Sequence, residues 1–345
     1  MASIAPFHNY PLHEILPDLK YSLSGLDRCI VGIDIGLKTV RFAVLSPNLS
    51  NSENHTIELE SIYANVAYNK KTQQLTIGEK LDFTNSEYLN LANGIHELAG
   101  LGYHDPRTAL LMMHLPFNVG PNVGIYAQAG SSARLGCAQV STDIENEPKT
   151  QGIKHHPGHM RTFVFTGESF LTFLFTKVKD VVKSETLLAK CDAVVSVPAC
   201  YDQSQREAII NAAKLAGIDV IRLIDATIAA SLTIQANQEH EYKLQNKPYP
   251  TKTMVIIDAG GTKTDVSIVR QDSNTTFEYV TVGTNDVVAD DIRCAYIDTV
   301  NDCFKAQNPE ISEEAIRKNV TAQQRLSEEI DKAMVELSAG KNATI

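Results

Sequence analysis

The sequence has no long apolar run, no closely spaced cysteine pair and no excess of basic residues. No stretch approaches the roughly 20 apolar residues of a membrane-spanning helix, so we expect no membrane segment. The six cysteines are scattered and form no Cys-x-x-Cys pair, which argues against a disulfide framework and predicts reduced thiols. The formal net charge of -10 argues against a general nucleic-acid binder, which would present a basic face. The composition fits a soluble, cytoplasmic protein.

The start of the chain lacks the pattern of a secretory signal. Residues 1–29 have neither a basic start nor an apolar core, so we expect a flexible N-terminal extension there. The 345 residues are enough for two domains or lobes of ordinary size, and an apolar fraction of 43% is that of a globular protein.

Helix and strand patterns alternate along the rest of the chain. We expect hairpins over 29–45 and 253–270, strands within 58–78, and a βαβ unit over 192–224 whose helix ends at Gly217 in a left-handed cap. Apolar spacing predicts a helix over 167–190, and we also expect helices over 88–100 and over the strongly charged tail 312–337. The Gly-, Ser-, Asn- and Pro-rich segment 118–160 predicts strands joined by mobile loops, and 237–252 predicts a polar insert.

The two hairpins share one layout. "VGIDIGLKTVRFAVL" and "VIIDAGGTKTDVSIV" both read apolar strand, Asp, one residue, Gly, short turn, apolar strand. Backbone N–H groups in such turns can point at phosphate oxygens, and an aspartate beside them can hold Mg²⁺ through water. The repeat therefore predicts a two-lobed, actin-like protein with one phosphate turn in each lobe.

The stretch "AVVSVPACYDQSQREAIINAAKLAGIDVIRLIDATIAASL", residues 193–232, resembles the seventy-kilodalton heat-shock chaperone (heat-shock protein 70) family. "LAGLGYHDP" followed by "MMHLPFNV" is similar to another family segment in order and spacing. The resemblance implies an α/β, actin-like (ribonuclease-H-like) ATPase fold that binds ATP or ADP with Mg²⁺. It further implies a complete lobe I over 30–236, a partial lobe II over 237–345 and no peptide-binding domain within the chain.

The resemblance also assigns site residues. Asp34 and Asp258 stand at the Mg²⁺-linked aspartates, and the remaining nucleotide positions follow. These are Gly36, Lys38, Gly260, Gly261, Thr262, Lys263 and Ser338.

Several positions depart from the family pattern. Leu37 replaces a threonine that contacts phosphate, and an isobutyl group donates no hydrogen bond. His96 stands where the family has its catalytic lysine, and Ala226 stands where it has a glutamate, followed by Thr227 in place of proline. Lys263 takes the place of a second phosphate-contacting threonine. The pattern indicates that the phosphate-binding turns are kept, whereas many of the side chains that contact phosphate or catalyse hydrolysis in the family are replaced.

Two further family segments are altered. "VVADD", 287–291, replaces a phosphate-contacting Gly-Gly-Glu-Asp. The helix that should contact adenosine carries Asp331, Met334 and Val335, and of its family residues only Ser338 is kept.

Simpler interpretations stand beside these. Asp34 and Asp258 could merely cap their turns. Lys38 and Lys263 could supply charge to a phosphate, or be solvated surface lysines. We expect His96 to be a partly exposed helix residue. The histidines of "KHHPGH", 154–159, could bind a metal, although no Cys or carboxylate stands at ligand spacing.

Three functions remain open. The first is a divergent heat-shock-type domain without efficient ATPase activity, which acts on other chaperones or co-chaperones as a binding, regulatory or nucleotide-exchange module. The second is an ordinary ATP-dependent chaperone domain. The third is a sugar-kinase-like enzyme of the same superfamily, since "DAGGTKTD" also resembles the phosphate turn of small-sugar kinases.

Overall fold

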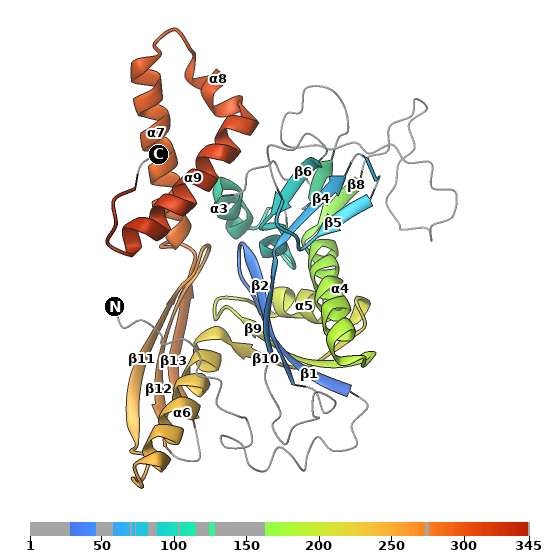
Figure 1. The fold of residues 1–345 in the computed structure, drawn as a ribbon, viewed down its shortest axis with the longest axis vertical. Helices are drawn as coiled ribbons and strands as arrows, with labels where there is room; N and C mark the ends of the chain where they lie inside the picture. Colours follow the sequence, from blue (N-terminus) through green and yellow to red (C-terminus); the bar gives the residue numbers. More distant parts are fainter. Residues whose placement is uncertain are drawn as a thin grey trace, which may run out of the picture. The chain divides into compact units, whose positions relative to one another are not determined.

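The fold is mixed α/β (Figure 1), and the chain divides into two compact units. The computed structural model describes residues 28–45, 58–69, 71–72, 74–81, 88–102, 104–114, 124–127, 163–272 and 276–343. The first unit comprises 1–62, 171–259 and 264–284, and the second comprises 63–170, 260–263 and 285–345. Residues 1–27 of the expected N-terminal extension and the "KHHPGH" histidines lie outside the described residues, whereas Arg28 and Cys29, which the expectation included, belong to a strand. The lobe boundaries 30–236 and 237–345 remain predictions.

A five-stranded mixed sheet forms the centre of the first unit, in the order β10-β9-β1-β2-β3. Its strands are β1 (Arg28–Ile35), β2 (Thr39–Leu45), β3 (Glu58–Tyr63), β9 (Lys190–Val197) and β10 (Ile218–Asp225). β1 runs antiparallel to β2 and parallel to β9, and β9 runs parallel to β10. The parallel pairs require crossover connections, which the helices of the chain supply.

Helices α4 (Gly167–Thr186) and α5 (Gln203–Leu215) provide those crossovers. α4 buries apolar residues at helical spacing, among them Phe170, Leu174 and Val178. α5 begins with a capping box, in which Asp202 accepts from the N–H of Gln205, and packs against β10. Gly217, with φ 75°, follows the end of α5 in the left-handed conformation that the sequence predicted.

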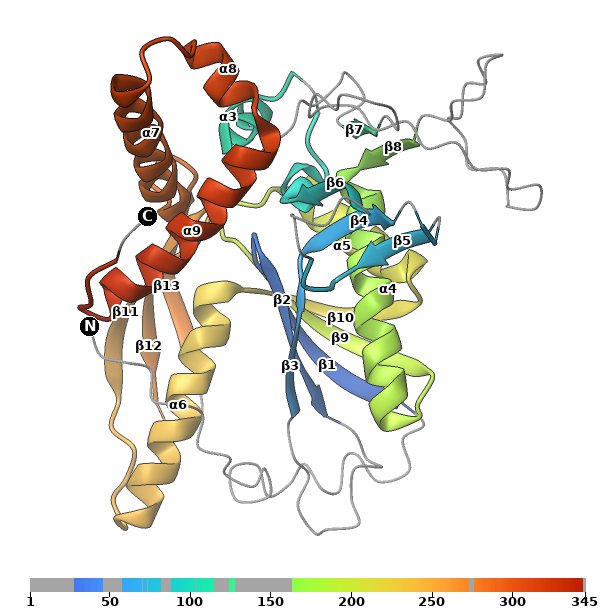
Figure 2. The same ribbon diagram turned by 45° about the horizontal axis from the view of Figure 1, so that its top comes forward.

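The first unit also contains a three-stranded antiparallel sheet and the long helix α6 (Ala226–Leu244), which packs on β11 and β12 (Figure 2). Its strands are β11 (Lys252–Ala259), β12 (Thr264–Gln271) and β13 (Thr276–Thr284). β11 and β12 form the second predicted hairpin, with Asp258 opposite Asp265. The first half of the expected polar insert continues helix α6, which ends at Leu244.

The second unit has two small sheets and a group of helices. The sheets are β5-β4-β6, from β4 (Asn65–Asn69), β5 (Gln74–Ile77) and β6 (Tyr88–Asn93), and the pair β7 (Gly124–Ala127) and β8 (Phe163–Thr166). The helices are the 3₁₀ helix η1 (Ile95–Leu98), α3 (Pro106–His114), α7 (Ala289–Gln307), α8 (Glu313–Lys318) and α9 (Val320–Ser338).

The helical tail matches the sequence expectation, and the predicted helix 88–100 is wrong. Its first half is strand β6, which pairs with β4, and only the short η1 is helical. Within the described residues, no helix has the length and apolar character that a membrane crossing requires.

Candidate functional site

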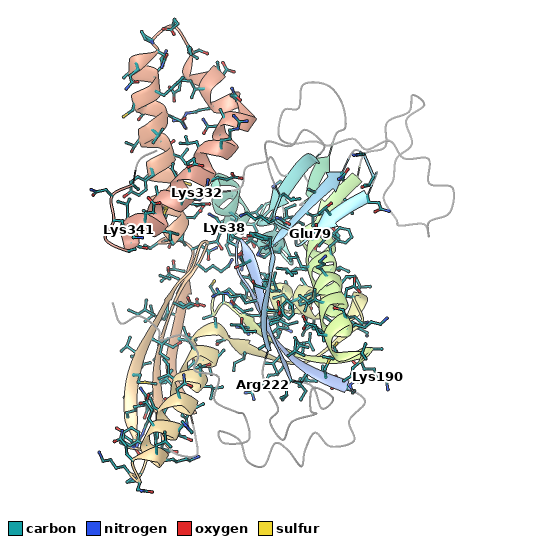
Figure 3. All side chains as sticks on the ribbon, in the orientation of Figure 1. Lys38, Glu79, Lys190, Arg222, Lys332 and Lys341 are labelled. Atoms are coloured by element: carbon teal, nitrogen blue, oxygen red, sulfur yellow. The ribbon has the colours of Figure 1, made fainter. Side chains whose placement is uncertain are left out.

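The first predicted turn places Asp34 at the end of β1. Gly36 N–H donates to Thr39 O at 2.9 Å, and a Cβ on Gly36 would lie 3.2 Å from that oxygen, so the turn is tight. Lys38 is exposed at the tip of the β1–β2 hairpin (Figure 3). Leu37, the position that lost a donor, is half-buried.

Asp34 has two partners that the sequence did not predict. Ser196 Oγ donates to Asp34 Oδ1 at 2.7 Å, because Ser196 stands directly opposite Asp34 in the parallel pair of β1 and β9. Arg41, exposed on β2, lies 3.4 Å from Asp34 Oδ2. Asp34 therefore does more than cap its own turn, although nearly half of its side chain, 47%, stays accessible.

Asp258, at the end of β11, lies within electrostatic reach of Asp34. Its side chain is partly accessible, and loss of water around it raises the pKa of its carboxyl. The negative charge of Asp34 raises that pKa further, and the positive charge of Arg41 opposes the rise. The two aspartates predicted for Mg²⁺ thus lie within electrostatic range of each other in the first unit, and Arg41 contacts Asp34.

A second turn carries Gly260, Gly261, Thr262 and Lys263. Gly260 N–H donates to Lys263 O at 2.8 Å, and a Cβ on Gly260 would lie 3.1 Å from the same oxygen. The carbonyls of Gly260 and Gly261 accept from the N–H groups of Ala289 and Asp290, each at 3.0 Å. These donors belong to the first turn of α7, within the altered segment 287–291. In this structure both N–H groups are therefore already hydrogen-bonded to carbonyl oxygens of the turn.

Lys263 is buried and paired, so the expectation of a solvated surface lysine is wrong, and its contact with a phosphate stays a prediction. Its ammonium donates to Glu97 Oε2, and Thr262 Oγ1 donates to Glu97 Oε1 at 2.9 Å. Lys263 also lies 3.4 Å from Thr262 Oγ1. A buried carboxylate here takes the contacts that a phosphate would take from a threonine and a cation.

His96 precedes Glu97 in η1 and is buried, which corrects the expectation of partial exposure. Its ring stacks on Phe170 with centroids 6.1 Å apart, and Nε2 lies 3.6 Å from Glu97 Oε1. Neither ring nitrogen has a hydrogen-bond partner among the described residues. Burial, and then the charge of Lys263, lower the pKa of His96 to about 3, so the ring is neutral near pH 7.

The remaining predicted positions are distributed over α6 and α9. Ala226 opens α6 and Thr227 follows it, fully buried, with its hydroxyl 2.6 Å from that of Ser267 on β12. Ser338, at the end of α9, is exposed and donates to Val335 O at 2.8 Å. None of these three positions brings a charged group to a turn.

Glu97, Ser196 and Arg41 are the site residues that sequence reasoning missed. Ser196 and Arg41 could be found only from strand register, and Glu97 only from the proximity of two segments distant in the chain. No cluster of three or more His, Cys, Asp or Glu side chains that could hold a metal occurs in the part of the chain that the structure describes.

The sequence is similar to one protein family and to several curated proteins. The sequence model of a family described as "Hsp70 protein" matches residues 132–345. A "Chaperone protein dnaK" of Thalassiosira pseudonana is 25% identical over 317 residues, which cover 92% of this chain and 45% of that protein.

Two further relatives match a shorter segment. The "Iron-sulfur cluster biogenesis chaperone, mitochondrial" of Saccharomyces cerevisiae is 31% identical over 153 residues, which cover 44% of this chain and 22% of that protein. A "Chaperone protein dnaK" of Phaeodactylum tricornutum is 34% identical over 153 residues, which cover 44% of this chain and 23% of that protein. The matches thus span less than half the length of these curated relatives.

Proposed function

Because the chain belongs to the Hsp70 family, we propose that it is a divergent Hsp70-type nucleotide-binding domain without efficient ATP hydrolysis. In this proposal it acts as a regulatory module on other heat-shock chaperones or co-chaperones, in the manner of a nucleotide-exchange partner. We also propose a cytoplasmic location, which rests on the acidic net charge.

The buried Glu97–Lys263 pair is the observation that carries the proposal. Phosphoryl transfer depends on fixed cations and donors placed around the phosphates. Lys263 is the cation that could have compensated for the family lysine replaced by His96, and it is held by a carboxylate instead. His96 supplies no positive charge, because its pKa of about 3 keeps it neutral near pH 7.

Family members bind ATP or ADP with Mg²⁺, and the two turns differ in how well their residues fit that ligand. In the first unit, Asp34 and Asp258 fit a hydrated Mg²⁺, since a cation would oppose both the loss of water and the repulsion by Asp34 that raise the pKa of Asp258. Bound Mg²⁺ would neutralise phosphate charge. In the second unit, the turn 260–263 does not fit a triphosphate, because Lys263 and Thr262 contact Glu97. This combination supports weak nucleotide binding at most.

An ATP-dependent chaperone domain is the second candidate. It is favoured by the retained Asp34, Gly36, Asp258, Gly260 and Gly261 and by the proximity of the two aspartates. The sugar-kinase interpretation loses its support, because the Hsp70 family model matches more than half of the chain.

The proposal is tested by release of fluorescent ADP from an ATP-hydrolysing Hsp70 mixed with this chain. We expect the chain to accelerate release and its Asp34→Asn variant to accelerate it equally, whereas an unrelated acidic protein does not. In parallel, MgATP should raise the melting temperature of the chain little, since stabilisation follows the ratio of ligand to dissociation constant. No acceleration, together with a large MgATP-dependent rise, would establish the second candidate instead.

A further inference from the structure

Two buried cysteines face each other at the start of neighbouring strands. Cys29 on β1 and Cys191 on β9 are directly paired in the parallel register, and their sulfur atoms lie 3.2 Å apart. Both thiols are free and almost completely buried. Neighbouring strands are about 4.8 Å apart, which is within the range of about 4.4–6.8 Å that Cα atoms span in disulfides.

The surroundings make the two thiols unequal. Cys29 Sγ also lies 3.4 Å from Lys190 O, and its pKa is raised by its interaction with Cys191 and by burial. The pKa of Cys191 is lowered, first by the hydrogen bond from Cys29 and also by the positive charges of Lys179 and Arg28. Cys191 therefore carries the greater thiolate character, and thiolates are the nucleophilic form of cysteine.

The pair lies one residue from the first residue of each strand. Arg28 begins β1 with a partly accessible side chain, and Lys190 begins β9 and is exposed (Figure 3). Strand ends open locally at low free-energy cost compared with global unfolding. A small oxidant can thus reach the two sulfurs without unfolding of the sheet.

We propose that Cys29 and Cys191 form a redox modification site, at which a hydroperoxide converts the two thiols into a disulfide joining β1 to β9. The Cys191 thiolate attacks the peroxide, the O–O bond breaks, and the products are the Cys191 sulfenic acid and hydroxide. The Cys29 sulfur then attacks Cys191 Sγ, the S–O bond breaks, and water leaves with the Cys29 proton. The hydroxide takes up the proton that the Cys191 thiol lost on ionisation, so in total two thiols lose two electrons and one hydrogen peroxide becomes two waters.

The cross-link would act on strands that also carry the carboxylate site. Asp34 and Ser196 are paired on the same β1 and β9, five positions further along each strand. A disulfide would fix the pairing of these strands and close a long loop of chain, which restricts the unfolded state. We expect the oxidised chain to melt several degrees higher than the reduced chain.

The test is peptide mapping after brief treatment of the full chain with hydrogen peroxide at about one equivalent, followed by alkylation under denaturing conditions. We expect a peptide pair linked through Cys29 and Cys191, which dithiothreitol separates. Cys29→Ser and Cys191→Ser should lose the linked pair and the oxidant-dependent rise in melting temperature. Cys303→Ser, which changes an exposed thiol on α7, should keep both.

The wild-type map alone can overturn the proposal, even if a serine variant fails to fold. The pair does not react with peroxide if Cys29 and Cys191 are recovered as alkylated thiols in a sample where the exposed Cys303 is oxidised. A disulfide between either residue and a different cysteine would contradict the proposal equally.

Discussion

The ammonium of Lys263 and the carboxylate of Glu97, 166 positions apart in the chain, form a buried ion pair beside the second glycine turn. Their side chains are only 7% and 5% accessible. At such burial each charge depends on the other, because removal of one partner leaves the second desolvated and uncompensated. The pair thus stabilises the turn through protein groups alone.

Removal of the Glu97 carboxylate should destabilise the fold strongly. We expect Glu97→Ala to lower the free energy of unfolding by about 3–5 kcal/mol, the range for breaking a buried pair. The double variant Glu97→Leu/Lys263→Met should recover much of that loss, because no buried charge remains. Urea denaturation measures the free energy of unfolding of the single and the double variant.

The matched control is Glu313→Ala, which removes a carboxylate 2.9 Å from Arg317 on an exposed helix. Exposed pairs contribute about 0–1 kcal/mol. If Glu97→Ala costs no more than Glu313→Ala, the buried pair does not hold the turn as argued.

His96 should make stability fall in mild acid. Its pKa is lowered to about 3 in the folded chain, compared with about 6.5 when unfolded. Between these values the unfolded chain binds the proton and the folded chain does not, so the free energy of unfolding decreases as pH falls below about 6.5. The slope from this group is about 1.4 kcal/mol per pH unit, and above about 6.5 its contribution is constant.

The substitution His96→Phe should remove this part of the pH dependence and keep the ring stack on Phe170. The measurement is urea denaturation at about pH 7 and about pH 5. His104→Asn, at an exposed histidine, should retain the wild-type slope. An unchanged slope in His96→Phe would mean that His96 is not the group responsible.

The three-stranded sheet should promote self-association. Val255, Ile268 and Val280 are paired across the strands, and Ile257 and Val282 extend the same accessible face. Large exposed apolar patches mark interfaces or aggregation-prone surfaces. We expect light scattering to show self-association of the chain at micromolar concentration. The double variant Ile257→Lys/Val282→Lys should reduce this self-association.

Val335→Lys is the control for that experiment, because Val335 is equally exposed but lies on α9, away from these strands in sequence. A monomeric wild-type chain with a cooperative melting transition would contradict the expectation. The expectation would also be contradicted if Val335→Lys reduced self-association as much as Ile257→Lys/Val282→Lys.

Local patterns were sufficient to predict the central elements. The apolar runs around Asp34 and Asp258 became hairpins, and the stretch around Gly217 became the predicted strand–helix–strand unit. These signals lie within a few residues of one another, so periodicity and turn chemistry capture them. The helix predicted over 88–100 failed because its first half pairs with β4, and tertiary pairing overrides helical spacing.

The site was less predictable for a related reason. Ser196 reaches Asp34 only through the register of two strands far apart in sequence. The sequence predicted a surface or phosphate-binding lysine at Lys263, whereas in the structure its ammonium is buried against the Glu97 carboxylate. Such long-range pairs leave no local pattern, whereas the loss of a donor at Leu37 could be inferred from the residue itself.

Single-turnover hydrolysis of radiolabelled ATP with Mg²⁺ and K⁺ tests the central claim most directly. We predict no hydrolysis above the uncatalysed background for the wild-type chain or for Leu37→Thr. One restored donor contributes about 2.7–4 kcal/mol only in a site already built to use it, and residues that act as a unit are not additive. Asp34→Asn should therefore lose nothing. Hydrolysis by the wild-type chain at a rate that Asp34→Asn abolishes would contradict the account and identify a working ATPase.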